Sequence, residues 1–147
     1  MKMITCFANE YGWLSNFAPV SVYWNGLYFP SVEHGYVAAK STNPEFWLKI
    51  QGTPTPGEAK RLGRKIELRP DWEHVKLPTM WELMIQKYNQ HTFERQLIAT
   101  DNAILIEGNA WGDRFWGCEY KHGEWVGLNW LGRLTMMIRD DKILRRF

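Results

Sequence analysis

Much of the chain repeats apolar residues at the spacing of amphipathic helices. Within residues 58–66, Ala59, Leu62 and Ile66 fall on one face, while lysines and arginines cover the opposite face. Residues 128–144 show a second amphipathic pattern. Apolar positions that recur every three or four residues are typical of helices that bury one side. The chain is therefore predicted to be largely helical.

Residues that favour helix starts divide this pattern into separate helices. Ser31 is a good N-cap, and Asn43 combines an N-cap with a proline at the first helical position. Thr55 and Glu58, three residues apart, form a capping box. The predicted helices cover residues 31–40, 44–51, 58–66, 78–90 (opened by Pro78), 92–99 (capped by Thr92) and 128–144.

Strand signals are few and short. Residues 20–24 and 27–29 flank Asn25-Gly26, a pair that suits both left-handed positions of a type I′ hairpin turn. We expect an α+β fold class, with a predominantly helical single domain over residues 1–147 and a few short β-strands. Further short strands are predicted at Met3–Phe7 and Ala103–Glu107, and loops at residues 8–19 and 108–127.

Composition and charge exclude several classes of protein. With 147 residues, of which 45% are hydrophobic, the chain suits a folded domain rather than a disordered segment. A net charge of +2 does not indicate a strongly basic nucleic-acid binder. No apolar run approaches the roughly 20 residues of a membrane span. Cys6 and Cys118 form no CxxC pattern, so we expect a reduced, cytoplasmic protein with no membrane partner.

Motifs for bound metals and nucleotide cofactors are missing from the sequence. The four histidines have no zinc-ligand spacing, and no GxGxxG, Walker or GxSxG pattern occurs. No metal and no cofactor are therefore expected, and nothing in the pattern specifies an oligomeric state. The unusual feature is nine tryptophans, a residue found in cores and in walls that stack on ligands.

Glu33 and Lys40 are the first candidates for chemistry. They lie seven residues apart on one predicted helix, so both side chains share a face at a separation of about 10 Å. A carboxylate beside aromatic residues at a helix start suits acid–base catalysis. Alternatively, Glu33 only complements the helix dipole. The neighbouring His34 is typical of a hydrogen-bonded structural histidine.

Two loops and one helix face are further candidates. The loop Trp111–Gly117 holds Asp113 and Trp116, which suggests either a hydrogen-bond acceptor beside a flat aromatic wall or a turn aspartate beside core tryptophans. The loop Trp13–Phe17 offers small polar groups between rings, or an Asx-type turn. A basic helix face suits a phosphate, although such faces are usually solvated. It consists of Lys60, Arg61, Arg64 and Lys65, with Arg69 beyond.

Six segments, in order along the chain, resemble the motifs of one family. The resemblance covers about Phe7 to Arg139 and is to the NADAR, or YbiA-like, family. It implies a small, largely helical α+β protein with N-glycosidase activity. Some members cleave phosphoribosylamino-pyrimidine intermediates of riboflavin biosynthesis, and others remove ADP-ribose from guanine bases of DNA. The segments are Leu14–Phe17, Ser31–His34 with Lys40, Thr55–Arg64, Arg69–Trp72, Gly112–Gly117, and Asn129–Gly132 followed by Met136–Arg139.

The same resemblance implies a set of site residues. Two departures from the family pattern, Tyr36-Val37 for Tyr-Gln and residues 100–102 for Thr-Gly-Asp, bear on substrate preference. The residues expected to be catalytic are Glu33, Lys40 and Asp113, and those expected to bind substrate are Ser15, Asn16, Phe17, His34, Arg64, Trp72, Trp116 and Asn129.

The expected reaction breaks the ribosyl C1′–N bond of a phosphorylated N-riboside, either a small molecule or an ADP-ribosylated nucleic acid. Glu33 is expected on the sugar side, with Asp113 as a second acid or an acceptor for a ribose hydroxyl. Lys40 is expected either to keep Glu33 ionised or to form a Schiff base with the opened ribose aldehyde. The alternative function is a binding module for ADP-ribose or another NAD derivative that cleaves nothing.

Overall fold

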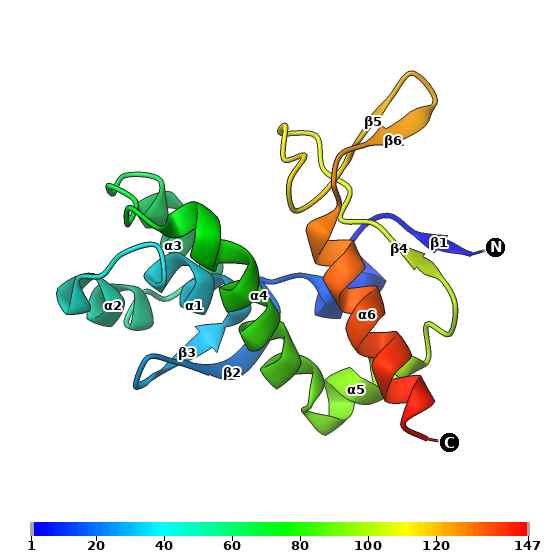
Figure 1. Ribbon diagram of the computed structural model, residues 1–147, viewed down its shortest axis with the longest axis horizontal. Helices are drawn as coiled ribbons and strands as arrows, with labels where there is room; N and C mark the ends of the chain where they lie inside the picture. The colour runs from blue at the N-terminus through cyan, green and yellow to red at the C-terminus, as the bar shows by residue number, and fades with distance from the viewer. Residues whose placement is uncertain (1, 147) are drawn as a thin grey trace. The chain divides into compact units, whose positions relative to one another are not determined.

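In a computed structural model, which describes residues 2–146, the chain forms two compact units (Figure 1). One is the continuous segment Asn16–Asn89, and the other is made of the chain on both sides of that segment. Helices are the main regular structure and the strands are short, which confirms the predicted α+β class. None of the helices in the described part of the chain is long and apolar enough to cross a membrane.

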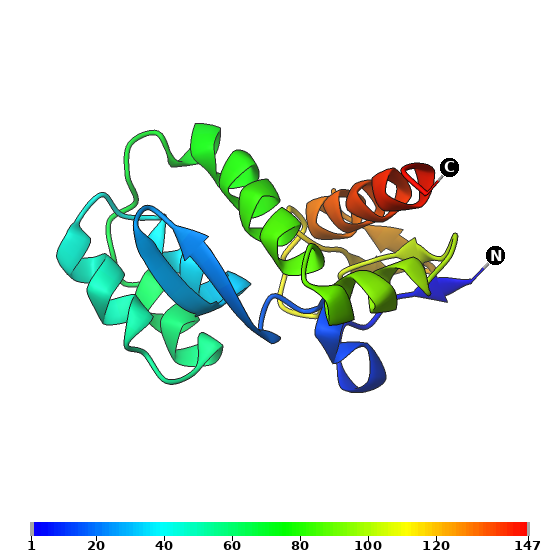
Figure 2. The ribbon, with the colours of Figure 1, turned by 90° about the horizontal axis from the view of Figure 1, so that it is seen from below.

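A β-hairpin opens the Asn16–Asn89 unit. Strands β2 (Pro19–Trp24) and β3 (Leu27–Ser31) pair antiparallel and run side by side in Figure 2. The turn residues Asn25 and Gly26 have φ angles of 47° and 90°. Both are left-handed, as a type I′ turn requires, so the predicted hairpin is confirmed.

Helix α1 (Val32–Ala38) follows β3 directly. The Ser31 hydroxyl accepts a hydrogen bond from the His34 N–H at 3.1 Å, which confirms the predicted N-cap. All seven residues of α1 are buried, because the β2–β3 hairpin and three helices pack around it (Figure 1). These helices are α2 (Pro44–Gln51), α3 (Pro56–Gly63) and α4 (Trp72–Tyr88).

The predicted starts of α2 and α3 are also confirmed. Asn43 Oδ1 accepts a hydrogen bond from the Glu45 N–H at 3.0 Å, and Thr55 Oγ1 accepts one from the Glu58 N–H at 3.2 Å. Helix α3 ends at Gly63, earlier than its amphipathic pattern predicted. Glycine weakens a helix, which accounts for the end of α3 at Gly63. A residue without a side chain also allows Val37 to pack closely there.

The start of α4 differs from the prediction. Pro78 was expected to open this helix, but it lies inside a helix that begins at Trp72. An internal proline removes a backbone hydrogen bond and costs about 3 kcal/mol. Trp72 is buried, and its ring packs on Tyr36 with 5.1 Å between ring centroids. Burial of the Trp72 ring stabilises the first turns of α4 and outweighs the preference of Pro78 for the first position of a helix.

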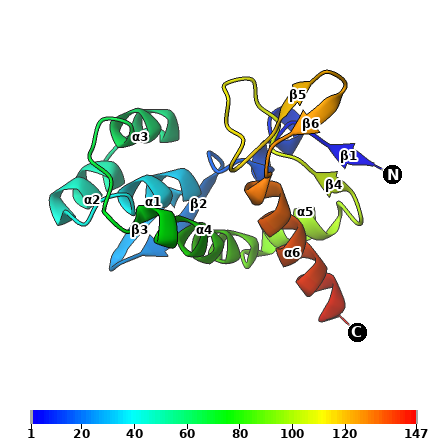
Figure 3. The same cartoon turned by 45° about the horizontal axis from the view of Figure 1, so that its top comes forward.

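The second unit is built around one long helix. Helix α6 (Trp130–Leu144) packs against α5 (His91–Ile98) and strand β4 (Ile104–Leu105), as Figure 3 shows. Strand β1 (Met3–Ile4) pairs parallel with β4. The 3₁₀ helix η1 (Asn9–Leu14) occupies part of the predicted loop. The two predicted strands are thus present, although each is only two residues long.

Two local features of this unit were not predicted correctly. The segment expected to be a loop contains a hairpin of β5 (Glu119–Lys121) and β6 (Glu124–Val126), which turns at His122 and Gly123 with φ angles of 51° and 84°. A histidine at a left-handed position gives a weak turn signal, and three-residue strands show little alternation. Helix α5 begins after Gln90, whereas Thr92 was expected to cap it.

Two glycine substitutions test how tightly α6 is packed. A Cβ added at Gly132 in α6 would overlap the Leu105 carbonyl oxygen and the Asn129 carboxamide. We expect Gly132→Ala to lower the free energy of unfolding by about 1–3 kcal/mol, because the backbone must move to admit the methyl group. Gly57 in α3 faces open space. Gly57→Ala should therefore stabilise by about 0.5 kcal/mol. Chemical denaturation measures both, and equal effects would contradict the packing argument.

Candidate active site

Helix α1 carries a buried acid at its first turn. Glu33 is only 8% exposed. Its backbone N–H donates a hydrogen bond to the Asn16 carbonyl at 3.1 Å, and the Asn16 amide lies 3.6 Å from the Met80 sulfur. The structure therefore brings the predicted residues Asn16 and Glu33 together.

Two turns later, Lys40 lies against a pair of aromatic rings. Its Nζ lies 5.4 Å from the centroid of the Tyr36 ring, and that ring packs on Trp72. Tyr36 lies one turn after Glu33 in α1, and Lys40 follows two residues after this helix ends at Ala38. Glu33, Lys40 and Trp72 are thus arranged around one tyrosine.

Helix α3 supplies positive charge to this region. Burial lowers the pKa of the Lys40 ammonium, and the charges of Lys60 and Arg64 lower that pKa further, against the opposing effect of the Glu33 carboxylate. The Lys60 Nζ also lies 5.8 Å from the centroid of the Phe17 ring. The predicted residue Arg64 thus lies near Lys40, and the predicted residue Phe17 lies beside Lys60 of α3.

This arrangement suits reaction at a carbonyl or an imine carbon. A lysine with a lowered pKa is neutral in a larger fraction of molecules near pH 7, and only the neutral amine is nucleophilic. A nearby buried carboxylate is able to take and return protons. Lys60 and Arg64 add positive charge that attracts a phosphate group.

His34 has a structural role in this unit. Its Nε2 donates a hydrogen bond to the Thr53 carbonyl at 2.9 Å, which leaves Nδ1 to accept from the Ser31 hydroxyl at 2.6 Å. The residue is 1% exposed. Both ring nitrogens are therefore used to fasten α1 to the chain between α2 and α3, as the structural interpretation of this histidine expected.

The remaining predicted site residues lie in the other unit. Asp113 Oδ1 accepts hydrogen bonds from the N–H groups of Phe115 and Trp116 at 3.1 and 2.9 Å. The Asn109 carboxamide binds backbone groups at four points of the same loop. The Ser15 N–H donates to the Gly12 carbonyl at the end of η1. Asp113 thus fixes the loop conformation and places the Trp116 ring.

The loop that carries Trp116 is joined to the start of α6. Backbone carbonyls of residues 114–117 accept hydrogen bonds from the N–H groups of residues 128–131. The Asn129 side chain accepts from the Glu107 N–H at 3.0 Å and donates to the Leu105 carbonyl at 2.9 Å. These hydrogen bonds therefore join the start of α6 to residues 114–117 and, through Asn129, to Leu105 and Glu107.

Comparison with known proteins identifies the family to which this architecture belongs. The NADAR domain family matches residues 5–142. The chain belongs to the NADAR family. The NMR structure of the Escherichia coli protein YbiA superposes with a TM-score of 0.80 and 30% sequence identity, over 99% of this chain and 89% of that one. The predicted family and fold are therefore confirmed.

Curated relatives of this NADAR chain carry two kinds of name. An N-glycosidase of Nostoc punctiforme is 36% identical over 89% of this chain and 85% of its own length. N-glycosidase YbiA of E. coli is 33% identical over 95% of this chain and 86% of its own length. A riboflavin biosynthesis protein of Vibrio vulnificus is 34% identical over 90% of this chain, which spans 36% of that protein. The chain is an enzyme of the N-glycosidase class.

Sequence reasoning gave too little weight to three residues around these NADAR segments. Tyr36 was given no role of its own, although its position lies between Glu33 and Lys40. Lys60 was grouped with a whole basic face, but only Lys60 and Arg64 act on Lys40. Asn109 was not noted, and its position next to Gly108 at the start of a glycine-rich loop was the available signal.

Replacing Lys40 tests its unfavourable environment. The folded state binds the Lys40 proton less tightly than the unfolded chain does, so the charge costs stability at neutral pH. This cost disappears as the pH rises toward the ordinary lysine pKa of about 10.4. Near pH 7 we expect Lys40→Met to melt at the same or a higher temperature than the native chain, and this advantage to shrink at alkaline pH.

Thermal unfolding followed by circular dichroism at neutral and alkaline pH measures this effect. Lys49→Met is the matched control, because Lys49 is an exposed lysine near the end of α2. A lower melting temperature for Lys40→Met at neutral pH, with a gap that does not change with pH, would show that the environment of Lys40 favours its charge.

Proposed function

We propose that this NADAR protein cleaves the ribosyl C1′–N bond of a phosphorylated N-riboside, with Glu33 and Lys40 as the reacting groups. The observation that carries this proposal is that Glu33 is buried and Lys40 lies beside the Tyr36 ring, with the pKa of Lys40 lowered by burial and by the charges of Lys60 and Arg64. A reactive amine and a carboxylate in the same region of the unit supply a nucleophile and a proton carrier without any further group.

In the proposed reaction, Lys40 replaces the base on the sugar carbon. The ribose ring opens when the C1′–O4′ bond breaks: Glu33 in its carboxylic acid form gives a proton to O4′ and becomes a carboxylate, and the lone pair of the exocyclic amine of the base forms a C1′=N iminium. The neutral Nζ of Lys40 adds to C1′ and loses a proton. Glu33 passes that proton to the base nitrogen, and the C1′–N bond breaks. Water then hydrolyses the lysine imine and releases the sugar aldehyde.

Neighbouring residues have distinct roles in this proposal. The Trp72 and Tyr36 rings keep water away from the amine and present an aromatic surface to the substrate. Lys60 and Arg64 attract the phosphate, and Asn16 and Phe17 line the same part of the unit. From the family resemblance we also propose substrate-binding roles for Ser15, Trp116 and Asn129, and a role for Asp113 as a second acid.

Two substrates fit this chemistry. One is a phosphoribosylamino-pyrimidine intermediate of riboflavin biosynthesis, in line with the name of the Vibrio vulnificus relative. The other is ADP-ribose attached to guanine in DNA. In both, the sugar carbon is bonded to the amine of a base and a phosphate is attached to the sugar. The family match spans segments of both units, and we propose that they act as one NADAR domain.

Product analysis by mass spectrometry distinguishes these substrates and tests Glu33. The native chain is incubated with each substrate, and release of ribose 5-phosphate or of ADP-ribose identifies the one that is cleaved. We expect Glu33→Gln to reduce turnover by about a hundredfold or more, because it removes the proton carrier. Glu45→Gln is the matched control, since Glu45 is an exposed glutamate in the first turn of α2.

The possible results of this assay separate three conclusions. Glu33→Gln turnover within tenfold of native, or about 1.4 kcal/mol, would remove Glu33 from the mechanism. Product from only one substrate would fix the substrate class. Folded protein that binds either substrate but releases no product would favour the alternative function, a module that binds ADP-ribose without cleaving it.

Reductive trapping tests the covalent role of Lys40. Borohydride reduces an imine to a stable secondary amine, so we expect peptide mapping to find the sugar attached to Lys40 after turnover in its presence. The exposed Lys49 should carry no adduct and serves as the internal control. Normal turnover in borohydride without any adduct would show that Lys40 acts only through its charge.

A further inference from the structure

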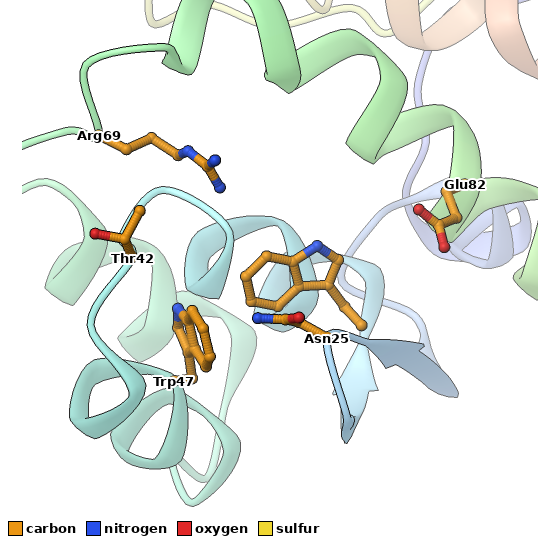
Figure 4. A pocket seen from close by; sticks show the side chains of 6 residues that line it. Asn25, Thr42, Trp47, Arg69 and Glu82 are labelled. Carbon is orange, nitrogen blue, oxygen red and sulfur yellow. The ribbon is translucent and has the colours of Figure 1, made fainter.

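A pocket of about 460 Å³ lies in the Asn16–Asn89 unit and has no part in the proposed reaction. Its walls come from the hairpin turn, the start of α2 and the chain before it, the segment before α4, and α4 itself (Figure 4). A volume of this size suits a ligand as large as a nucleoside. The lining residues are Trp24, Asn25, Thr42, Trp47, Arg69 and Glu82.

Two tryptophans form a rigid aromatic corner in this pocket. The rings of Trp24 and Trp47 have centroids 5.1 Å apart and an angle of 86° between their planes. Trp47 is fixed by a hydrogen bond of 2.7 Å from its Nε1 to the Ser41 carbonyl, and Trp24 also packs on Phe29. Both indoles are half-buried. Such a corner offers a pre-formed surface on which a planar ring is able to stack.

Several polar groups of the residues that line the pocket make no hydrogen bond within the described part of the chain. Among the described residues, none bonds to the Trp24 indole N–H, the Asn25 carboxamide, the Thr42 hydroxyl or the Glu82 carboxylate. Arg69 and Glu82 reach the pocket from opposite sides in Figure 4. The pocket therefore combines a stacking surface with both donors and acceptors at its rim.

The charges of the lining residues restrict the class of ligand. Glu82 disfavours an anion. Arg69 disfavours a quaternary ammonium ion, although two hydrogen bonds to Asp71, of 2.6 and 3.1 Å, balance its charge. A neutral planar ring with donors and acceptors along its edge avoids both conflicts. Nucleobases have this form, and a carboxylate accepts hydrogen bonds from the exocyclic amino group of a base.

We propose that this pocket binds a nucleobase that carries an exocyclic amino group. The base stacks on the Trp24–Trp47 corner, its amino group donates to the Glu82 carboxylate, and Asn25 and Thr42 bind the remaining edge. The proposal does not depend on the reaction at Glu33 and Lys40. The occupant is either a free nucleoside or a base in a nucleic-acid strand, since both present the same edge.

Cytidine and uridine are suitable probes, because the exocyclic amine of one is replaced by a carbonyl in the other. As nucleosides without phosphate, neither is drawn to the positive charge of Lys60 and Arg64. We expect calorimetry to show tighter binding of cytidine by the native chain, and nuclear magnetic resonance to show shifts of the Trp24 and Trp47 indole N–H signals. No saturable binding at millimolar concentration, or equal affinity for both nucleosides, would overturn the proposal.

Three variants place the binding in the pocket. Trp47→Leu should weaken binding of both nucleosides by about tenfold or more, because one stacking surface is lost. Glu82→Ala should abolish the preference for cytidine but keep uridine binding, and exposed Glu82 is removable without loss of the fold. Tyr28→Leu is the control, since Tyr28 lies on the same hairpin, 65% exposed, outside the pocket. Native affinity and preference in both Trp47→Leu and Glu82→Ala would overturn the proposal.

Two further measurements identify the source of the base and separate the two proposals. A short oligocytidylate that binds more tightly than cytidine, with an affinity that falls as salt is added, indicates a nucleic-acid strand, whereas equal affinities indicate a free nucleoside. Glu33→Gln should bind cytidine as the native chain does. If the Glu33→Gln variant bound cytidine and also turned over substrate as the native chain does, the proposed reaction would be contradicted and the proposed nucleobase site would not be affected.

Discussion

The burial of helix α1 determines how the Asn16–Asn89 unit is built. A helix of seven residues is not stable by itself in water, because it forms too few hydrogen bonds to offset the cost of nucleation. Its stability must come from the hairpin and the three helices that cover it. Glycines permit this close cover: a Cβ at Gly35 would lie 3.1 Å from Leu83, and one at Gly63 would lie 2.9 Å from Val37. The same enclosure obliges each polar group on α1 to find a partner.

His34 and Lys40 meet that obligation in opposite ways. The imidazole of His34 has both nitrogens bonded, so it stabilises the unit and is unsuited to bind a substrate. Lys40 lies two residues beyond the end of the helix, where burial and the charges of Lys60 and Arg64 oppose its charge, while Glu33 and the Tyr36 ring favour it. A side chain chosen for stability alone would not be a lysine at this position. A reactive amine is expected to cost stability in this way, and this cost supports the proposal that Lys40 rather than His34 takes part in the reaction.

Local sequence signals predicted the parts of the fold that are decided locally. Asn25-Gly26 specified the hairpin turn, and Asn43 and Thr55 specified helix starts, because each acts within three or four residues. Pro78 misled for the opposite reason, since the burial of Trp72 against Tyr36 is a contact between distant parts of the chain. The candidate site divides in the same way. Helical spacing predicted Glu33 and Lys40 close together, although α1 ends at Ala38. The effect of Lys60 on Lys40 was not predictable in this way, because it depends on how α3 packs. For Asp113, a short motif could not distinguish a ligand-binding acid from one that also holds backbone N–H groups.

The nine tryptophans of the chain do not all have the same structural role. Trp72 is buried and begins α4, whereas Trp24 and Trp47 are half-buried and face a pocket in which Asn25, Thr42 and Glu82 make no side-chain hydrogen bond to the described residues. Arg69 connects these two regions. Its backbone N–H donates a hydrogen bond to the Lys40 carbonyl at 2.9 Å, and its guanidinium donates to Asp71 at the start of α4. A change at Arg69 would therefore disturb the lysine, the helix start and the pocket wall together. Glu33 and Glu82 each belong to only one of the two regions, and for that reason they are the positions at which the reaction and the proposed nucleobase site are separable.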